Sequence, residues 1–144
     1  MGCDGRVGSL DLTVKIARDL YDEIVAHARE EAPNECCGMV GSNDGQALAV
    51  YRAVNAEASP LRFRIDPEEQ LELHTKIEDA GLELGAIYHS HTRTAPRPSQ
   101  TDINFARNWP GVEWVIVGLA GEEPEVRCYL IEDSVVREVE LRVR

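Results

Sequence analysis

Apolar residues in the first part of the chain follow a pattern that predicts a strand and then a helix. Residues 12–16 alternate between apolar and polar side chains, as a half-buried strand does. After this strand, apolar residues recur at every fourth position, which places them on one face of a helix. These residues are Ile16, Leu20, Ile24 and Ala28, and the pattern ends at Pro33.

Two further strands are predicted on either side of a polar turn. Residues 36–40 and 47–54 are largely apolar, and the Ser-Asn-Asp-Gly sequence at 42–45 is typical of a tight turn. Glu35 therefore lies at the entry to a strand. Residues 62–65 could form another short strand.

The next segment carries a strong signal for the start of a helix. Asp66 suits the N-cap, Pro67 suits the first helical position, and two acidic residues follow in the first turn. The predicted helix continues to Ala80, before Gly81.

An apolar segment at 84–88 leads directly into His89-Ser90-His91. The two histidines therefore lie at the C-terminal end of a predicted buried strand. After a proline-rich loop at 92–98, Ser99 and Asp102 have the spacing of a capping box, which opens a short helix. This helix is predicted to end near residue 108.

Residues 112–119, 126–131 and 135–143 complete the chain as predicted strands. The pattern then comprises about three helices among seven or eight strands. It predicts an α/β or α+β fold with one main sheet. Without an internal repeat or a linker-like segment, residues 1–144 are expected to form a single domain.

Charge narrows the range of partners. The chain has 15 basic and 26 acidic residues, for a net charge of -11. Such a charge repels phosphate groups, so we expect protein partners rather than nucleic acid or membrane. The N-terminus lacks an apolar signal segment, and no apolar run approaches the roughly 20 residues that span a bilayer, so a cytoplasmic location is expected. The four cysteines form no C-x-x-C pair and are expected to be free thiols: Cys3, Cys36, Cys37 and Cys128.

His89 and His91 form a candidate metal clamp. Residues two apart in a strand point to the same face, so both imidazoles can reach one ion while Ser90 points away. Asp102, at the start of the next helix, can supply a third ligand. Two histidines, one carboxylate and a water describe a catalytic zinc site. If Asp102 binds a metal, its carboxylate is not expected also to bond the Ser99 backbone, so we expect Asp102 to cap its helix only weakly.

Hydrolysis at such a site also requires a base and a donor to the developing oxyanion. Glu35 is the best candidate for the base, and the Ser99 hydroxyl could be the donor. Taken alone, Glu35 could equally be an ordinary charged residue before a strand, and Ser99 with Asp102 a plain helix cap. Arg93 and Arg97 could be solubilising charges or could bind a substrate carboxylate.

The order and spacing of these residues resemble the E-x(n)-H-S-H-x7-S-x2-D motif of JAMM (MPN+) metallopeptidases. The segment at 33–38, Pro-Asn-Glu-Cys-Cys-Gly, is similar to the P-x-E-x-C-G segment of that family. Element order also agrees over nearly the whole chain. The motif positions are filled by Glu35, His89, Ser90, His91, Ser99 and Asp102.

The resemblance implies a cytidine-deaminase-like fold, a curved mixed sheet packed by about three helices. It implies one Zn²⁺ per chain on His89, His91 and Asp102, with water as the fourth ligand. It also assigns activation of that water to Glu35 and polarisation of the scissile carbonyl to Ser99.

The family removes ubiquitin or ubiquitin-like proteins from their conjugates. This short chain is similar to the compact prokaryotic branch, which includes peptidases that release cysteine from the C-terminus of a ubiquitin-like sulfur carrier, as a step of cysteine biosynthesis. The resemblance therefore implies a peptidase that hydrolyses the peptide or isopeptide bond after the C-terminal glycine of such a carrier.

Other functions remain open at this point. The chain could be a non-catalytic MPN-type scaffold, although such domains lose the metal ligands, or a peptidase that removes a protein tag. Iron(II) oxygenases also use two histidines and a carboxylate, but usually in the order H-x-D and then a distant histidine. A zinc base deaminase would need H-x-E and P-C-x-x-C, which the sequence lacks.

Overall fold

The computed structural model describes residues 13–144, which contain three helices and seven strands in the predicted order. Cys3, Leu12 and the expectations for the N-terminal segment lie outside the described residues. The helices are α2 (Arg18–Glu31), α3 (Pro67–Asp79) and α4 (Gln100–Ala106). The strands are β1 (Thr13–Ile16), β2 (Cys37–Asn43), β3 (Gln46–Ala53), β4 (Glu83–His91), β5 (Glu113–Gly118), β6 (Glu125–Glu132) and β7 (Val135–Val143).

The strands form one mixed sheet in the order β1-β3-β2-β4-β5-β6-β7. Neighbouring strands are antiparallel except at three pairs, β4–β5, β1–β3 and β1–β7. Because β1 pairs with both β3 and β7, the sheet closes into a barrel. The expected curved mixed sheet is thus confirmed, and its closure joins the first described strand to the last.

The alternation of side chains along β4 separates two layers of core. Tyr88 packs in one apolar cluster with Ile24 of α2. Ile87, one residue earlier, packs in another cluster with Trp114 and with Ala106 of α4. Since residues two apart share a face, the odd-numbered residues at the end of β4 point toward the α4 side.

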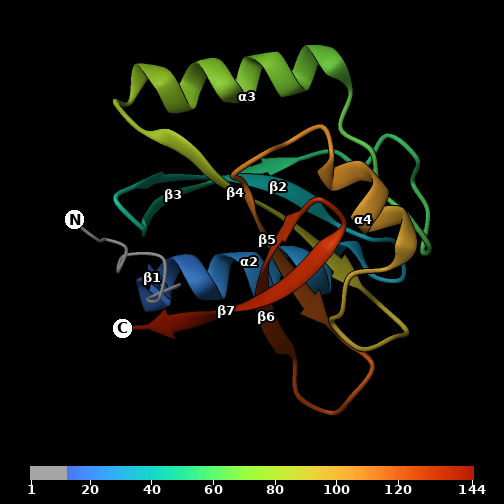
Figure 1. The fold of residues 1–144 in the computed structure, drawn as a ribbon. Coiled ribbons are helices and arrows are strands. Elements are labelled where there is room, and N and C mark those ends of the chain that lie inside the picture. The colour runs from blue at the N-terminus through green and yellow to red at the C-terminus, as the bar shows by residue number, and fades with distance from the viewer. Residues whose placement is uncertain (1–12) are drawn as a thin grey trace.

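Helix α3 covers the neighbouring part of that second face. Figure 1 shows α3 and α2 on opposite sides of the layer formed by β2, β3 and β4. The cluster beneath α3 contains Met39 of β2 together with Leu73 and Ile77 of the helix. The sheet thus presents one face to α2 and the other to α3 and α4.

Local signals at the turns and helix starts are largely confirmed. Asp44 and Gly45 both have positive φ, 53° and 79°, as expected for a two-residue hairpin turn between β2 and β3. Asp66 is the N-cap of α3 and Pro67 begins the helix. The Asp66 carboxylate does not cap, because it accepts from the Arg64 guanidinium instead, at 3.1 Å.

The short strand predicted at residues 62–65 is wrong, since this segment has no regular secondary structure. Its backbone groups bond within their own loop. The carbonyl of Arg64 accepts from the N–H of Ala56 at 2.8 Å. The Asn55 side chain bonds the N–H of Arg64 at 3.2 Å and the carbonyl of Arg62 at 3.0 Å. These groups are therefore not available to a β-ladder.

Among the described residues, no helix is long and apolar enough to cross a membrane. Cys36, Cys37 and Cys128 are free and buried, as expected. Burial raises the pKa of all three thiols, which therefore remain protonated near neutral pH. They behave as small apolar core residues.

Close packing of β2 on β4 generates a stability prediction. Gly38 pairs with Tyr88, whose hydroxyl lies 2.7 Å from Nδ1 of His27. A Cβ at position 38 would overlap the Tyr88 ring. We therefore expect Gly38→Ala to lower the free energy of unfolding by about 1–3 kcal/mol, as overpacked cores do.

Urea denaturation of this variant and of Gly121→Ala provides the measurement and its control. A Cβ at position 121 would meet only the carbonyl of Glu123, at an ordinary 3.8 Å. Equal losses of stability in the two variants would contradict the packing argument.

Candidate metal and catalytic site

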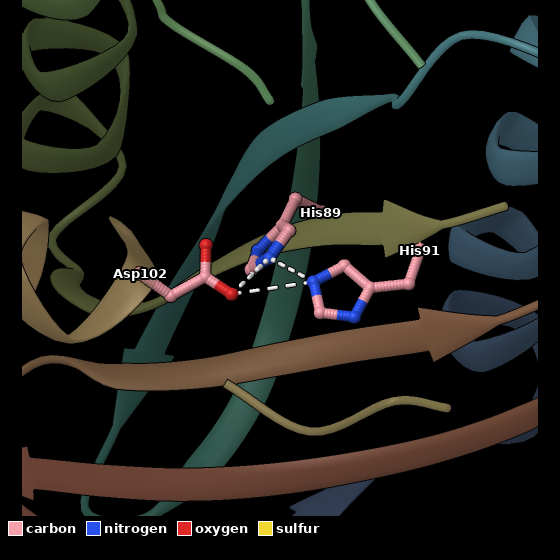
Figure 2. Close-up of side chains that lie close together, drawn as sticks. All are labelled: His89, His91 and Asp102. Carbon is pink, nitrogen blue, oxygen red and sulfur yellow. Dashed lines mark hydrogen bonds and ion pairs between the residues drawn. The ribbon is translucent and has the colours of Figure 1, made fainter. Parts of the chain in front are cut away.

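Three side chains from β4 and α4 converge on one point. His89 and His91 are both buried and project from the same face of β4, as predicted. Their Nε2 atoms are 3.3 Å apart, and each lies 3.2 Å from Oδ2 of Asp102 (Figure 2). Asp102 is buried in the first turn of α4. The capping sequence that opens this helix thus brings its carboxylate to the end of β4.

The donor atoms fit a tetrahedral metal site. Ligand atoms bound to zinc at about 2.0–2.1 Å lie roughly 3.3–3.4 Å from one another at a tetrahedral angle. The separations between Nε2 of His89, Nε2 of His91 and Oδ2 of Asp102 match that spacing within about 0.2 Å. Two imidazoles and one carboxylate also leave a fourth position free, as catalytic zinc sites do.

The second ring nitrogen of His91 selects the tautomer that a metal needs. Nδ1 of His91 lies 3.0 Å from the carbonyl oxygen of Ala95, which can only accept a hydrogen bond. Nδ1 therefore carries the hydrogen. In the neutral imidazole Nε2 then has the lone pair that a metal binds, whereas in the protonated ring Nε2 carries a hydrogen toward Asp102.

His89 is held in a different way. Its Nδ1 is buried and has no hydrogen-bond partner among the described residues. The ring of Phe63 stacks on the imidazole instead, with centroids 4.6 Å apart and planes at 25°. Phe63 in turn meets Phe105 of α4 edge-on. Aromatic packing rather than a second hydrogen bond therefore sets the orientation of this ring.

Asp102 closes the capping box as well as facing the histidines. Its Oδ2 accepts from the N–H of Ser99 at 2.9 Å, and its own N–H donates to Oγ of Ser99 at 3.1 Å. The expectation that a metal-facing Asp102 would cap only weakly is therefore wrong. A carboxylate offers several lone-pair sites, so one group can serve both purposes.

The histidines also control the charge of Asp102. Burial by itself would raise the pKa of this carboxyl, but the charge of His89 and hydrogen bonds from His89, His91 and the Ser99 backbone hold it well below its usual range. Burial would likewise lower the pKa of His91, yet its bonds to Asp102 and the Ala95 carbonyl raise it. The carboxylate is thus charged across the physiological range.

Glu35 lies beside this group through the pairing of β2 with β4. Cys37 pairs with His89, and Glu35 lies two residues before Cys37, close enough to His91 and Asp102 for both charges to act on its carboxyl. The Glu35 side chain is only 4% exposed. Burial raises its pKa to about 7, with a lowering contribution from His91 and a raising one from Asp102. A carboxylate with this pKa suits proton transfer near neutral pH.

The backbone of Glu35 is fixed from two directions. Its N–H donates to the carbonyl of Ser59 at 2.9 Å, and its carbonyl accepts from Nδ2 of Asn55 at 3.0 Å. On the other face, Oγ of Ser90 accepts from the N–H of Cys36 at 2.8 Å. Ser90 therefore points away from the histidines, as predicted, and anchors the strand that follows Glu35.

The remaining candidates lie at the edge of the site or outside it. Ser99 is the exposed N-cap of α4, and its Oγ accepts a hydrogen bond while keeping a hydroxyl hydrogen to donate. Arg93 and Arg97 are exposed in the loop between β4 and α4, and their role stays a prediction. The sequence interpretation missed Asn55 and Phe63. Both belong to a loop without periodicity, and only their tertiary contacts relate them to the site.

Comparison with known proteins gives a consistent result. Residues 17–132 match the family model Prok-JAB, described as prokaryotic homologs of the JAB domain. The chain is 37% identical over 131 residues to the CysO-cysteine peptidase of Mycobacterium tuberculosis, covering 89% of each protein. It is 37% identical to the desampylase of Haloferax volcanii, covering 72% of this chain and 78% of the relative. A Desulfitobacterium hafniense protein solved in solution superposes with a TM-score of 0.83 at 32% identity, covering 91% of this chain and 92% of the other.

The geometry predicts that Asp102 matters more as a ligand than as a cap. Asp102→Asn keeps an oxygen that can accept from the Ser99 N–H but loses the negative charge. We therefore expect the affinity for Zn²⁺ to fall at least about tenfold. Ser99→Ala is the matched control, because it removes the other capping bond and no ligand. Competition of each variant with a chelating dye measures the affinity, and equal losses in both would contradict the assignment.

The raised pKa of Glu35 predicts how stability changes with pH. Between its ordinary value of 4.5 and about 7, the native protein binds a proton that the unfolded chain has released. The contribution of Glu35 to stability therefore falls as the pH rises through this range. We expect Glu35→Gln to stabilise the chelator-treated protein by about 1–3 kcal/mol at pH 8 and not at pH 4.

Denaturation of wild type, Glu35→Gln and Glu122→Gln at both pH values tests this. Glu122 is exposed, so its substitution should change stability by no more than about 0.5 kcal/mol. A Glu35→Gln protein no more stable than wild type at pH 8 would show that this carboxyl does not oppose folding.

Proposed function

The chain belongs to the Prok-JAB family of JAMM/MPN proteins, and from this premise we propose that it is a zinc-dependent peptidase acting on a ubiquitin-like carrier. The proposed substrate bond follows the C-terminal glycine of the carrier, and the proposed product is free cysteine from a carrier-cysteine adduct. We include in this proposal one domain over residues 1–144 and a cytoplasmic location.

One observation carries the proposal. The buried carboxyl of Glu35, whose pKa burial raises to about 7, lies within electrostatic reach of His91 and Asp102, and these two residues meet His89 in one buried group of potential metal ligands. A scaffold domain would gain nothing from this arrangement, because burying ionisable groups opposes folding unless they are paired. The cost in folding free energy has a functional explanation if the two histidines and Asp102 hold a metal and Glu35 transfers protons.

The residues divide the chemistry among them. Zinc held by His89, His91 and Asp102 would supply Lewis-acid activation of the attacking water and of the scissile carbonyl. Glu35 takes the proton from the water as its oxygen bonds to the carbonyl carbon. The same carboxyl then gives that proton to the departing amine as the C–N bond breaks.

Ser99 completes this proposed assignment. As the N-cap of α4 it stands beside Asp102, and its Oγ already accepts the Asp102 N–H. The hydroxyl hydrogen is then free to donate to the oxyanion that develops on the carbonyl oxygen. Among the described residues, no hydrogen bond donated by this hydroxyl is seen.

Two kinds of substrate are supported by relatives of equal identity. The name of the M. tuberculosis relative contains CysO-cysteine, and the match spans most of both chains. The H. volcanii relative is named desampylase, which favours the alternative of removing a protein tag. We prefer the cysteine adduct because of the longer match. Exposed Arg93 and Arg97 could meet the carboxylate of the released residue.

The central experiment measures zinc content and cleavage by intact mass. We expect wild type to hold about one zinc and to trim a ubiquitin-like carrier ending in Gly-Gly-Cys. Glu35→Gln should keep its zinc and cut at least about 100-fold more slowly, since general-base catalysis is lost. Glu122→Gln, at an exposed position, should match wild type in both.

A carrier joined through the side chain of a lysine separates the substrates. If only this conjugate is cut, the tag-removing alternative replaces the cysteine adduct. If Glu35→Gln cuts as fast as wild type, the proton-transfer role is wrong. If wild type binds no zinc, the non-catalytic scaffold replaces the peptidase.

A further inference from the structure

Asn55 is a buried amide with four hydrogen bonds, between the end of β3 and the loop at residues 56–65. The side chain is 8% exposed. Its Oδ1 accepts from the N–H of Glu57 at 3.0 Å and of Arg64 at 3.2 Å. Its Nδ2 donates to the carbonyls of Glu35 and Arg62, both at 3.0 Å. One amide thus uses both hydrogens and both acceptor sites.

The two halves of the amide do different things. Oδ1 closes the loop on itself, because Glu57 and Arg64 lie near its two ends. Nδ2 joins the closed loop to Glu35, which lies outside it. The reverse contact, from the N–H of Glu35 to the carbonyl of Ser59, completes a two-point attachment. The N–H and the carbonyl of Glu35 are therefore both bonded to this loop and Asn55, and neither extends the β-ladder of β2.

The same loop forms a wall of the site. Phe63 stacks on the imidazole of His89, whose Nδ1 has no other described partner. A cavity of about 210 Å³ lies between the loop and α4, with Phe63, Phe105 and Asp102 in its lining. A shift of this loop would therefore move the backbone of Glu35 and the ring that stacks on His89 at the same time.

We propose that Asn55 is a positioning residue that fixes Glu35 and the loop at residues 56–65 relative to each other. The inference rests on the proposed function for the role of Glu35. The alternative is that Asn55 only stabilises the fold, as any satisfied buried amide does. The two differ in where the effect of a substitution appears.

Hydrogen exchange tests the attachment without any substrate. Asn55→Ala should raise exchange of the amides of Glu35, Glu57 and Arg64 by about tenfold or more, while β5 amides change less. Ser59→Ala is the matched control. It removes the bond from the N–H of Leu61 to Oγ of Ser59 in the same loop, but keeps the Ser59 carbonyl that Glu35 uses.

Kinetics on the carrier-cysteine adduct test the consequence. Asn55→Asp keeps the acceptor that closes the loop and loses the donor to the carbonyls of Glu35 and Arg62. We expect its kcat to fall at least about tenfold, with KM and zinc content within about threefold of wild type. Rates are compared on the plateau of each pH profile, so that a shift in the pKa of Glu35 does not enter the comparison. Ser59→Ala should stay within about twofold throughout.

Each result has a defined meaning. A kcat for Asn55→Asp within twofold of wild type overturns the proposal, as does Glu35 exchange in Asn55→Ala equal to that in Ser59→Ala. If amide exchange in Asn55→Ala rises across β5 as much as at Glu35, Asn55 only stabilises the fold. Should Asn55→Ala fail to fold, exchange in Asn55→Asp must still rise at Glu35 and stay unchanged at Glu57. A wild type that cuts no adduct refutes the proposed function, and exchange then decides the role of Asn55 alone.

Discussion

The antiparallel register between β2 and β4 is the constraint on which the site depends. It pairs Cys37 with His89, and Glu35 lies two residues before Cys37, so the register brings Glu35 to the end of β4 that carries His91. A slip of one residue would turn one partner's side chains to the opposite face, because strands alternate with a period of two. Gly38 against Tyr88 and Ser90 against the Cys36 N–H fix this register from the α2 side. Packing on the α2 face of the sheet thus determines how Glu35 and the histidines are placed on the opposite face.

Burial has opposite consequences for the two carboxyls of the site. Among the described residues, no cationic side chain donates a hydrogen bond to the Glu35 carboxyl, so loss of solvent raises its pKa to about 7. Asp102 loses solvent too, but two imidazoles and a backbone N–H bond its oxygen, and its pKa falls. One carboxyl is therefore suited to exchange protons, and the other to hold a fixed negative charge. The difference comes from hydrogen-bond partners and not from residue type.

The site is also built between regular and irregular structure. His89 and His91 belong to β4, which is hydrogen-bonded to a strand on each side, and this pairing holds their backbones in place. Glu35, by contrast, is bonded through its backbone to a loop without regular secondary structure. A buried amide at Asn55 supplies the order that a β-ladder would otherwise provide. Two of its four bonds, to the Arg62 carbonyl and from the Arg64 N–H, satisfy backbone groups of the segment where a strand was wrongly expected.

The sequence by itself determined the element order, the starts of α3 and α4, and the convergence of His89, His91 and Asp102. These features depend on short-range periodicity and capping, which act over a few residues. Glu35 was a candidate base from its place before an apolar strand, but only the resemblance to a family motif distinguished it from an ordinary charged residue, because it lies 54 positions before His89. The tertiary structure alone decided the closure of the barrel, the stacking of Phe63 and the bonds of Asn55. It also showed that Asp102 caps its helix while facing the histidines. All of these depend on contacts between distant segments, and local patterns of hydrophobic and polar residues do not specify which segments meet.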